Sequence, residues 1–228
     1  MKIIYGSSVR SDGNMALHIN DDINTVVTNR INFLTKFDLK LSNLICMNQT
    51  HSNNVKIVST KDMGAGAKNQ NDAIADCDAI ITTDRELILA VMSADCVPII
   101  LYDENMGIAA VVHAGWKGTA GEIVKKTLYK MIDEIGACAE SIKVVIYPAI
   151  GECCYEVGSD TASLCGCKGS SRLDLKKLNY EQIVSIGIPD KNISISKECT
   201  SCSSSDFFSY RADNGNTGRL MSFVVLKQ

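Results

Sequence analysis

The 228-residue sequence lacks an excess of basic charge and lacks long apolar runs. Its formal net charge of −3 leaves no basic surface for nucleic acid or for an anionic membrane. No apolar run approaches the ~18 residues of a membrane span, and the first residues contain no long apolar segment of the kind found in signal peptides. These absences predict a cytoplasmic protein that binds neither nucleic acid nor a membrane.

Proline is scarce as well, with three residues in the chain, and no Ser/Gly-rich linker divides the sequence. No internal repeat of roughly 20 to 50 residues is present either. We therefore expect a single domain over residues 1–228, which is long enough to bury a core without covalent staples. Ten cysteines fall below the density of a secreted disulfide scaffold, so reduced thiols are expected.

Apolar patterns predict a mixture of strands and helices. The clearest helix is expected from Ala120 to Ile135, because Thr119 and Glu122 have the spacing of a capping box and Gly136 can end the helix in a left-handed conformation. A second helix is expected from Val26 to Phe37, with Val26, Val27, Ile31 and Leu34 on its buried face, and a third from Leu175 to Ile186.

Four successive apolar runs are joined by turns that are too short to hold a crossover helix, which favours antiparallel neighbours. These runs cover Ala79 to Thr82, Leu87 to Met92, Val97 to Tyr102 and Ile108 to Val112. Further strands are expected at Leu44 to Met47, Val55 to Ser59, Lys143 to Pro148 and Leu220 to Leu226.

A thiol and an imidazole, Cys96 and His113, stand at opposite ends of one predicted strand pair, and His51 follows another apolar run. Three interpretations are open. Cys96 and His113 could be a core cysteine and a hydrogen-bonded histidine. With His51 they could form a zinc site with an open fourth position. Cys96 could also be a thiolate nucleophile that His113 activates. Spacing does not separate the last two interpretations.

The segment after His113 has the features of a ligand-binding turn. Gly115 and Gly118 allow a sharp turn and a close approach to a ligand, and the following helix offers free N–H groups to an anion. Lys117 could add positive charge, and Trp116 could be either a core residue or a platform for substrate. An ordinary strand-to-helix turn would explain the same glycines.

Near the C-terminus, Arg211 and Arg219 lie among aromatic residues in a Gly/Asn-rich turn, which suits an anionic or planar group; surface arginines beside a turn are the alternative. Three cysteine pairs add further thiols. A structural zinc site would require two pairs to converge, and this is not favoured because no segment carries the rest of a zinc-ribbon pattern. The pairs are Cys153 with Cys154, Cys165 with Cys167, and Cys199 with Cys202.

Seven ordered blocks resemble the YfiH-type family, which is known as laccase-domain or polyphenol oxidase proteins and also as a peptidoglycan editing factor. The blocks are GNMALHINDDINTVVTNR, QTHSNNV, DCDAIITT, SADCVPIILYD, HAGWKGT, PAIGECCYEVG and CTSCSSSDFFSYRADNGNTGRLMSFVVL. The resemblance implies an α+β fold of mixed β-sheets with flanking helices, similar to the deamidase domain of cytotoxic necrotizing factor. In that domain a Cys/His pair performs thiol chemistry.

The resemblance also implies one zinc ion held by His51, Cys96 and His113, and activity on purine nucleosides. The activities implied are phosphorolysis of adenosine, inosine or guanosine, cleavage of methylthioadenosine, and deamination of adenosine. Copper is less suitable, because a multicopper set needs around ten imidazoles. The chain has three histidines, which excludes a multicopper laccase within a single chain.

Two carboxylates, Asp95 and Asp78, could orient a histidine or move a proton. Arg30, Arg211, Lys117 and the Gly115 to Thr119 turn are candidates for binding phosphate. Two other classes of function stay open. One is a cysteine hydrolase or amidase that acts on a peptidoglycan precursor through Cys96 and His113. The other is a non-catalytic partner-binding protein.

Overall fold

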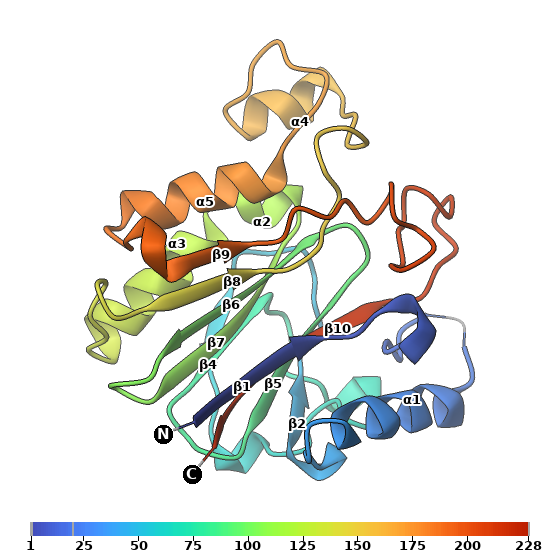
Figure 1. Cartoon of the computed structure of the whole chain (residues 1–228), viewed down its shortest axis with the longest axis vertical. Helices are drawn as coiled ribbons and strands as arrows, with labels where there is room; N and C mark the ends of the chain where they lie inside the picture. The colour runs from blue at the N-terminus through green and yellow to red at the C-terminus, as the bar shows by residue number, and fades with distance from the viewer. Residues whose placement is uncertain (1, 20, 228) are drawn as a thin grey trace.

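Two β-sheets pack face to face and carry helices on their outer faces in the computed structural model, which describes residues 2–19 and 21–227 (Figure 1). This arrangement confirms the predicted α+β class of mixed sheets with flanking helices. The four-stranded sheet has the order β1 (Lys2–Ser7), β10 (Leu220–Lys227), β5 (Ile88–Ser93), β2 (Leu44–Cys46). The six-stranded sheet has the order β3 (Val55–Ile57), β4 (Ala79–Thr82), β7 (Ile108–Ala114), β6 (Val97–Asp103), β8 (Lys143–Ile146), β9 (Ile193–Ile195).

The helices form two outer layers. Helix α1 (Ile23–Thr35) covers the four-stranded sheet, and α2 (Trp116–Ala120), α3 (Ile123–Tyr129) and α5 (Leu175–Ser185) cover the six-stranded sheet on the opposite side of the molecule (Figure 1). Helix α4 (Ser159–Leu164) lies beyond α5. Short 3₁₀ turns occur at Arg10–Asp12, Leu41–Asn43, Thr60–Asp62, Gln70–Asp72 and Asp190–Asn192. None of the helices in the described residues has the length and apolar character needed to cross a bilayer.

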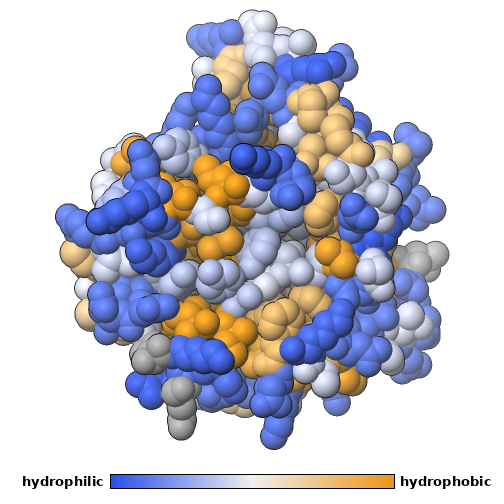
Figure 2. All heavy atoms as spheres, in the orientation of Figure 1, coloured by the Kyte–Doolittle hydropathy of each residue, from blue (hydrophilic) through white to orange (hydrophobic). Residues whose placement is uncertain are grey.

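Strand β7 shows why the central runs are apolar throughout. Ile108, Ala110 and Val112 face the helices, whereas Ala109 and Val111 face the other sheet. Because successive side chains point to opposite faces, the central residues of a strand that is covered on both sides are apolar at successive positions. Partly buried side chains of β1 and β8 continue this inter-sheet core to the surface. In the view of Figure 2, patches of apolar side chains lie around a centre of intermediate hydropathy, inside a largely hydrophilic rim.

The successive runs that form β6 and β7 are antiparallel neighbours as predicted, and β7 also pairs antiparallel with β4, which does not adjoin it in the sequence. The prediction is wrong for the run at Leu87 to Met92, which forms β5 of the other sheet, between β10 and β2. Residues 83–87 connect β4 to β5. Five extended residues reach about 16 Å, more than the ~10 Å between packed sheets, so a turn too short for a crossover helix still carries the chain to the second sheet.

The predicted helix from Ala120 to Ile135 is interrupted, and the predicted capping box is absent. Glu122 has a left-handed backbone (φ 56°) and separates α2 from α3. Asn53 packs at this junction: its side chain donates to Gly121 O, and a Cβ on Gly121 would lie 2.7 Å from Asn53 Nδ2. Beyond α3 the chain forms a π-helical turn over Lys130–Glu134 and leaves it at Gly136, whose φ of 90° matches the predicted left-handed end.

The remaining predicted helices and strands lie within a few residues of their expected bounds, whereas the sequence patterns do not predict β1, β9 or α4. Helix α1 differs from its predicted face. Ile31 is 44% exposed, and Arg30 is buried in its place with 1% exposure. Arg30 Nε donates to Met15 O at 2.7 Å, and Nη1 donates to Gly66 O and Ala67 O. The guanidinium therefore ties α1 to two loops.

Replacing Arg30 by Met is expected to lower the free energy of unfolding by about 3 kcal/mol, because three buried carbonyl oxygens lose their donor. Activity per folded molecule is expected to persist. Chemical denaturation and turnover measurements check both points, with R85M, a change at an exposed residue, as the control. Unchanged stability together with a loss of phosphate-dependent turnover would instead make Arg30 a phosphate ligand.

Candidate functional site

His51, Cys96 and His113 come together at one end of the six-stranded sheet. His113 lies in β7 beside Pro98 of β6, Cys96 immediately precedes β6, and His51 lies in the loop between β2 and β3. The ligand atoms of the three side chains are all within 4.8 Å of one another. Cys96 Sγ is 3.9 Å from His51 Nε2, and the two imidazole centroids are 4.9 Å apart. The three donors can therefore bind one metal ion.

Asp78 fixes the orientation of His113. Its buried Oδ1 lies 2.8 Å from His113 Nδ1, and the carboxylate also accepts hydrogen bonds from the backbone N–H groups of His51 and Ser52. Burial by itself raises the pKa of Asp78, but the hydrogen bonds from His113 and Ser52 reverse this effect and lower it to about 2. The carboxylate is therefore ionised, and it directs the Nδ1–H of His113 toward itself, which leaves Nε2 for the site.

Cys96 and His113 shift the pKa of each other. Burial raises the pKa of the Cys96 thiol, but His113 and, to a smaller extent, His51 bring it well below its ordinary value. Burial lowers the pKa of His113, whereas Cys96 and Asp78 raise it above its ordinary value. Without a metal ion the pair therefore favours a thiolate beside an imidazolium. A thiolate is both a good zinc ligand and a nucleophile.

Asp95 has a different role from the expected orientation of a histidine. Its Oδ1 accepts a hydrogen bond from Thr200 Oγ1 at 2.6 Å, and its Oδ2 accepts one from the backbone N–H of Arg211 at 2.7 Å. These contacts join the start of β6 to a segment more than a hundred residues away. Asp95 and His51 have left-handed backbones, with φ of 87° and 58°, which L-residues rarely adopt outside constrained sites.

A cavity of about 490 Å³ opens over the three ligands, within the size range of small-molecule sites. All three histidines of the chain line it. Its walls also include three aromatic side chains and two arginines, which suit a planar base and an anion. These residues are Trp116, Tyr155, Tyr210, Arg211 and Arg219.

The Gly-rich turn contributes mainly through its backbone. A Cβ on Gly115 would lie 2.9 Å from Cys96 Sγ, so only glycine allows the chain to pass this close to the thiol. A Cβ on Gly118 would lie 3.3 Å from His113 O. Lys117 is exposed and places Nζ 5.6 Å from the Trp116 ring centroid. Neither Lys117 nor Arg30 is among the described residues that line the cavity.

His18, which no sequence pattern singled out, also lines the cavity. Desolvation, followed by the positive charge of Arg219, lowers the pKa of His18, so its imidazole is neutral at pH 7. The signal that could have identified it is the scarcity of histidine together with its position in a family-like block. Gln49 was also missed. Its amide exchanges two hydrogen bonds with the Met92 backbone and so fixes the cavity wall to β5.

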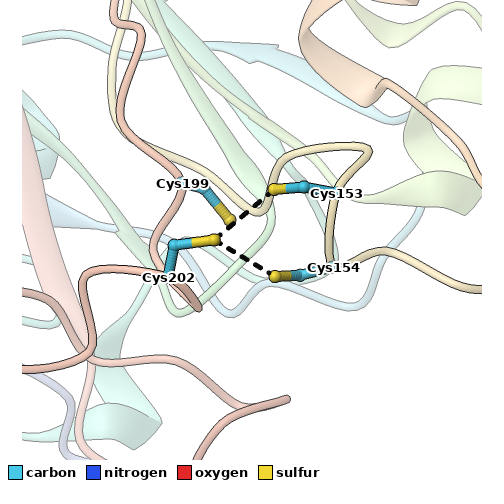
Figure 3. Close-up of side chains that lie close together, drawn as sticks. All are labelled: Cys153, Cys154, Cys199 and Cys202. Atoms are coloured by element: carbon cyan, nitrogen blue, oxygen red, sulfur yellow. Dashed lines mark hydrogen bonds between the residues drawn. The ribbon is translucent and has the colours of Figure 1, made fainter.

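Four of the other cysteines converge, an arrangement that the sequence did not favour. Cys153 and Cys154 approach Cys199 and Cys202, and all four sulfur atoms lie within 4.8 Å of one another (Figure 3). The convergence arises because Ala149 and Cys199 form a parallel β-bridge that brings the two loops side by side. Cys165 and Cys167 do not join this group; they pack against the core beside the helices.

All ten cysteines lie within the described residues, and the structure contains them as free thiols. Thiol titration of freshly denatured protein, with a metal chelator present, is therefore expected to find clearly more than half of them reactive. The matched measurement after complete reduction gives the full count. A freshly denatured sample in which no thiol reacts before reduction would contradict the expected redox state.

The fold and the site define an α+β protein in which two histidines and a cysteine are placed so that they can hold one metal ion, beside a cavity of a size typical of small-molecule sites. The chain belongs to the family described as multi-copper polyphenol oxidoreductase laccase, whose model matches residues 5–227.

Two sequence relatives and a solved structure extend this comparison. A protein of Bacillus subtilis named purine nucleoside phosphorylase YlmD is 35% identical, with 94% of this chain and 82% of the relative covered. Adenosine deaminase RL5, from an unknown prokaryotic organism, is 30% identical, with 98% and 90% covered. The crystal structure of YlmD from Geobacillus stearothermophilus superposes with a TM-score of 0.95 at 31% identity, covering 99% of this chain and 92% of that one.

Proposed function

We propose that this chain is a zinc-dependent purine nucleoside phosphorylase that also deaminates adenosine and cleaves methylthioadenosine. One observation carries the proposal: the metal-ligating set, the aromatic side chains and the arginines line a single cavity. The names of the two sequence relatives support a nucleoside as substrate. Phosphate and a purine nucleoside are then the two substrates of the main reaction.

The donor set fits zinc. Two imidazole nitrogens and a thiolate are ligands that zinc prefers, and three protein ligands leave the fourth position open, as in catalytic zinc sites. Asp78 accepts a hydrogen bond from His113 Nδ1 and so holds the imidazole in the orientation that a metal-ligating histidine needs, a contact typical of such sites. Bound zinc would supply Lewis acidity to a water molecule or to a reacting oxygen. A multicopper set would need around ten imidazoles, whereas this chain has three.

The surrounding residues fit the two substrates. Trp116 and Tyr155 offer aromatic faces for a purine, and Arg211 and Arg219 offer charge for phosphate. Phosphorolysis breaks the bond between the base nitrogen and C1′ of the ribose and forms a bond from C1′ to a phosphate oxygen, while the departing base gains a proton. That proton comes from the attacking hydrogen phosphate, and His18, whose pKa is lowered and which lies in the cavity wall, is suited to accept it and pass it to the base.

A second function is supported by the contact between Cys96, His113 and Asp78. A thiolate, a histidine and an orienting carboxylate form the arrangement of a cysteine hydrolase or amidase, which would act on an amide such as that of a peptidoglycan precursor. In this reaction Cys96 Sγ bonds to the carbonyl carbon, the amine leaves with a proton from His113, and water then releases the acid. This reaction needs no metal ion.

Incubation with inosine tests the nucleoside proposal. Zinc-loaded protein is expected to release hypoxanthine in the presence of phosphate, with ribose 1-phosphate formed in equal amount. Release of hypoxanthine without phosphate and without ribose 1-phosphate would indicate hydrolysis and contradict a phosphorylase. No release from any purine nucleoside, with zinc verified in the protein, would contradict the substrate assignment.

Replacing Asp78 by Asn is expected to weaken zinc binding about 10- to 100-fold and to lower kcat/KM, because His113 loses its charged partner and its fixed tautomer. Competition with a chromophoric chelator measures the affinity. D76N is the matched control, since Asp76 is exposed and only two residues away. Equal zinc affinity and activity in D78N and D76N would show that Asp78 does not support the site.

A further inference from the structure

The group of Cys153, Cys154, Cys199 and Cys202 lies outside the metal-ligating set described above. Cys202 Sγ lies 3.5 Å from Cys153 Sγ and 3.3 Å from Cys154 Sγ, and no pair among the four sulfurs is farther apart than 4.8 Å. Figure 3 shows the four side chains pointing from two loops toward a common centre. Four sulfur atoms with no other donor type form a set with strong preference for a soft or borderline metal ion.

These separations suit a tetrahedral ion. A zinc–sulfur bond is about 2.3 Å, so the sulfurs of a tetrahedral site lie about 3.8 Å from one another. The two shortest contacts, 3.3 and 3.5 Å, differ from this value by about 0.5 Å or less, and no pair exceeds 4.8 Å, so side-chain movements of about 1 Å or less complete the tetrahedron. Cys199 and Cys202 have the usual C-x-x-C spacing of a zinc site, whereas the adjacent Cys153 and Cys154 form the other half.

The backbone around the sulfurs also favours thiolates. The Gly151 N–H donates to Cys199 Sγ at 3.1 Å. A Cβ on Gly151 would lie 3.2 Å from both Cys153 Sγ and Cys199 Cβ, so glycine permits this close approach of backbone to sulfur. A backbone N–H that points at a sulfur atom stabilises negative charge on that sulfur. A bound cation would stabilise the same charge.

We propose that these four cysteines hold a second, structural zinc ion. Binding would replace four thiol protons by Zn²⁺, with four zinc–sulfur bonds formed and four protons released. With four protein ligands the site is closed to substrate and takes no part in the chemistry of the cavity. It would lie on the exposed side of the two loops, where three of its ligands are at least partly accessible to solvent.

The position of the site indicates what the ion does. The two loops that it would join also form one wall of the cavity, since Ile150, Tyr155 and Arg211 line it. Arg211 Nη1 donates to Cys154 O at 2.9 Å, and Nη2 donates to Glu156 O at 2.9 Å. An ion bound to both loops would fix this wall and so hold Arg211 in place. The proposal of this second ion does not depend on which reaction the cavity supports.

The competing outcome is a disulfide between two of the four cysteines. Cys202 Sγ is about equally close to Cys153 Sγ and Cys154 Sγ, so the geometry does not select one partner. A four-coordinate ion uses all four sulfurs together, whereas a disulfide would leave two of them unpaired. Mass analysis of unreduced protein after alkylation of free thiols distinguishes the two states.

Metal analysis of protein purified without added zinc tests the proposal. We expect two zinc ions per chain in the wild type, one in C202S and one in C96A, because each variant loses a different site. C138S is the matched control, since Cys138 is exposed and lies outside both groups, and it is expected to keep both ions. C202S is also expected to have a lower thermal midpoint than C138S.

Cobalt substitution of C96A keeps the test valid if C202S fails to fold. Because C96A lacks a complete cavity site, its remaining ion is expected to show the sulfur-to-cobalt charge-transfer bands of a tetrahedral tetrathiolate. The proposal is overturned by equal zinc content in C202S and C138S, by a disulfide within the group, or by the visible absorption of an iron–sulfur cluster. Loss of zinc in C96A alone concerns only the cavity site and the proposed nucleoside chemistry.

Discussion

Replacing Cys96 by alanine is expected to remove the zinc ion from the cavity and to lower the turnover of purine nucleosides by more than about 100-fold. Partners in the second coordination shell alone change metal affinity or activity by 10- to 100-fold, and Cys96 is a direct ligand in the proposed site. The protein is expected to stay folded, because the change removes a single sulfur atom at the edge of a cavity.

Zinc content and circular dichroism measure the two outcomes for C96A. The matched control is C167A, which changes another half-buried cysteine outside both metal-ligating groups and is expected to keep its zinc and its activity. Unchanged zinc content in C96A would contradict the assignment of this thiol as a ligand.

Removal of zinc by a chelator is expected to abolish phosphorolysis, and adding zinc back is expected to restore it, because the metal carries the Lewis acidity. The cysteine-hydrolase function gives the opposite pattern. If Cys96 is the nucleophile, hydrolysis survives chelation and is lost on alkylation of the thiol. Circular dichroism of the chelated protein separates loss of the ion from loss of the fold. Activity that is unchanged after complete metal removal would contradict the zinc mechanism.

The grouping of His51, Cys96 and His113 could be expected from the sequence because these residues stand where apolar runs begin or end. His51 follows the apolar run of β2, and Cys96 immediately precedes β6. His113 is the second-to-last residue of β7. Strand ends that belong to neighbouring strands meet in space, so local patterns were sufficient here. Orienting a histidine was one of the two roles expected for Asp78, but its contact with His113 depends on the pairing of β4 with β7, which the short turns between successive runs do not predict.

The roles of Arg30 and Asp95 could not be predicted in the same way. Arg30 contacts carbonyl groups of two loops, and Asp95 contacts Thr200 and Arg211. Whether a charged side chain binds a ligand or the protein backbone depends on its neighbours in the folded structure. These neighbours are remote in sequence. The same reason explains why Cys153 and Cys202 were not expected to meet. Their convergence depends on a β-bridge between distant loops.

The assignment of strands to sheets could also be predicted only in part. Apolar runs identified most of the strands, but a run that is apolar at every position does not indicate which sheet it joins. The assignment of β5 to the smaller sheet therefore depends on its partners β10 and β2, which lie at opposite ends of the sequence. The interruption between α2 and α3 likewise depends on Asn53, a residue from another loop.

Product analysis with adenosine tests the proposed function most directly. Protein with verified zinc in the cavity site is incubated with adenosine, with and without phosphate, and adenine, inosine and hypoxanthine are separated. We expect adenine to form only with phosphate, inosine to form with or without it, and hypoxanthine to follow from inosine only with phosphate. Absence of all three products from zinc-loaded, folded protein would contradict the proposal that this cavity acts on purine nucleosides.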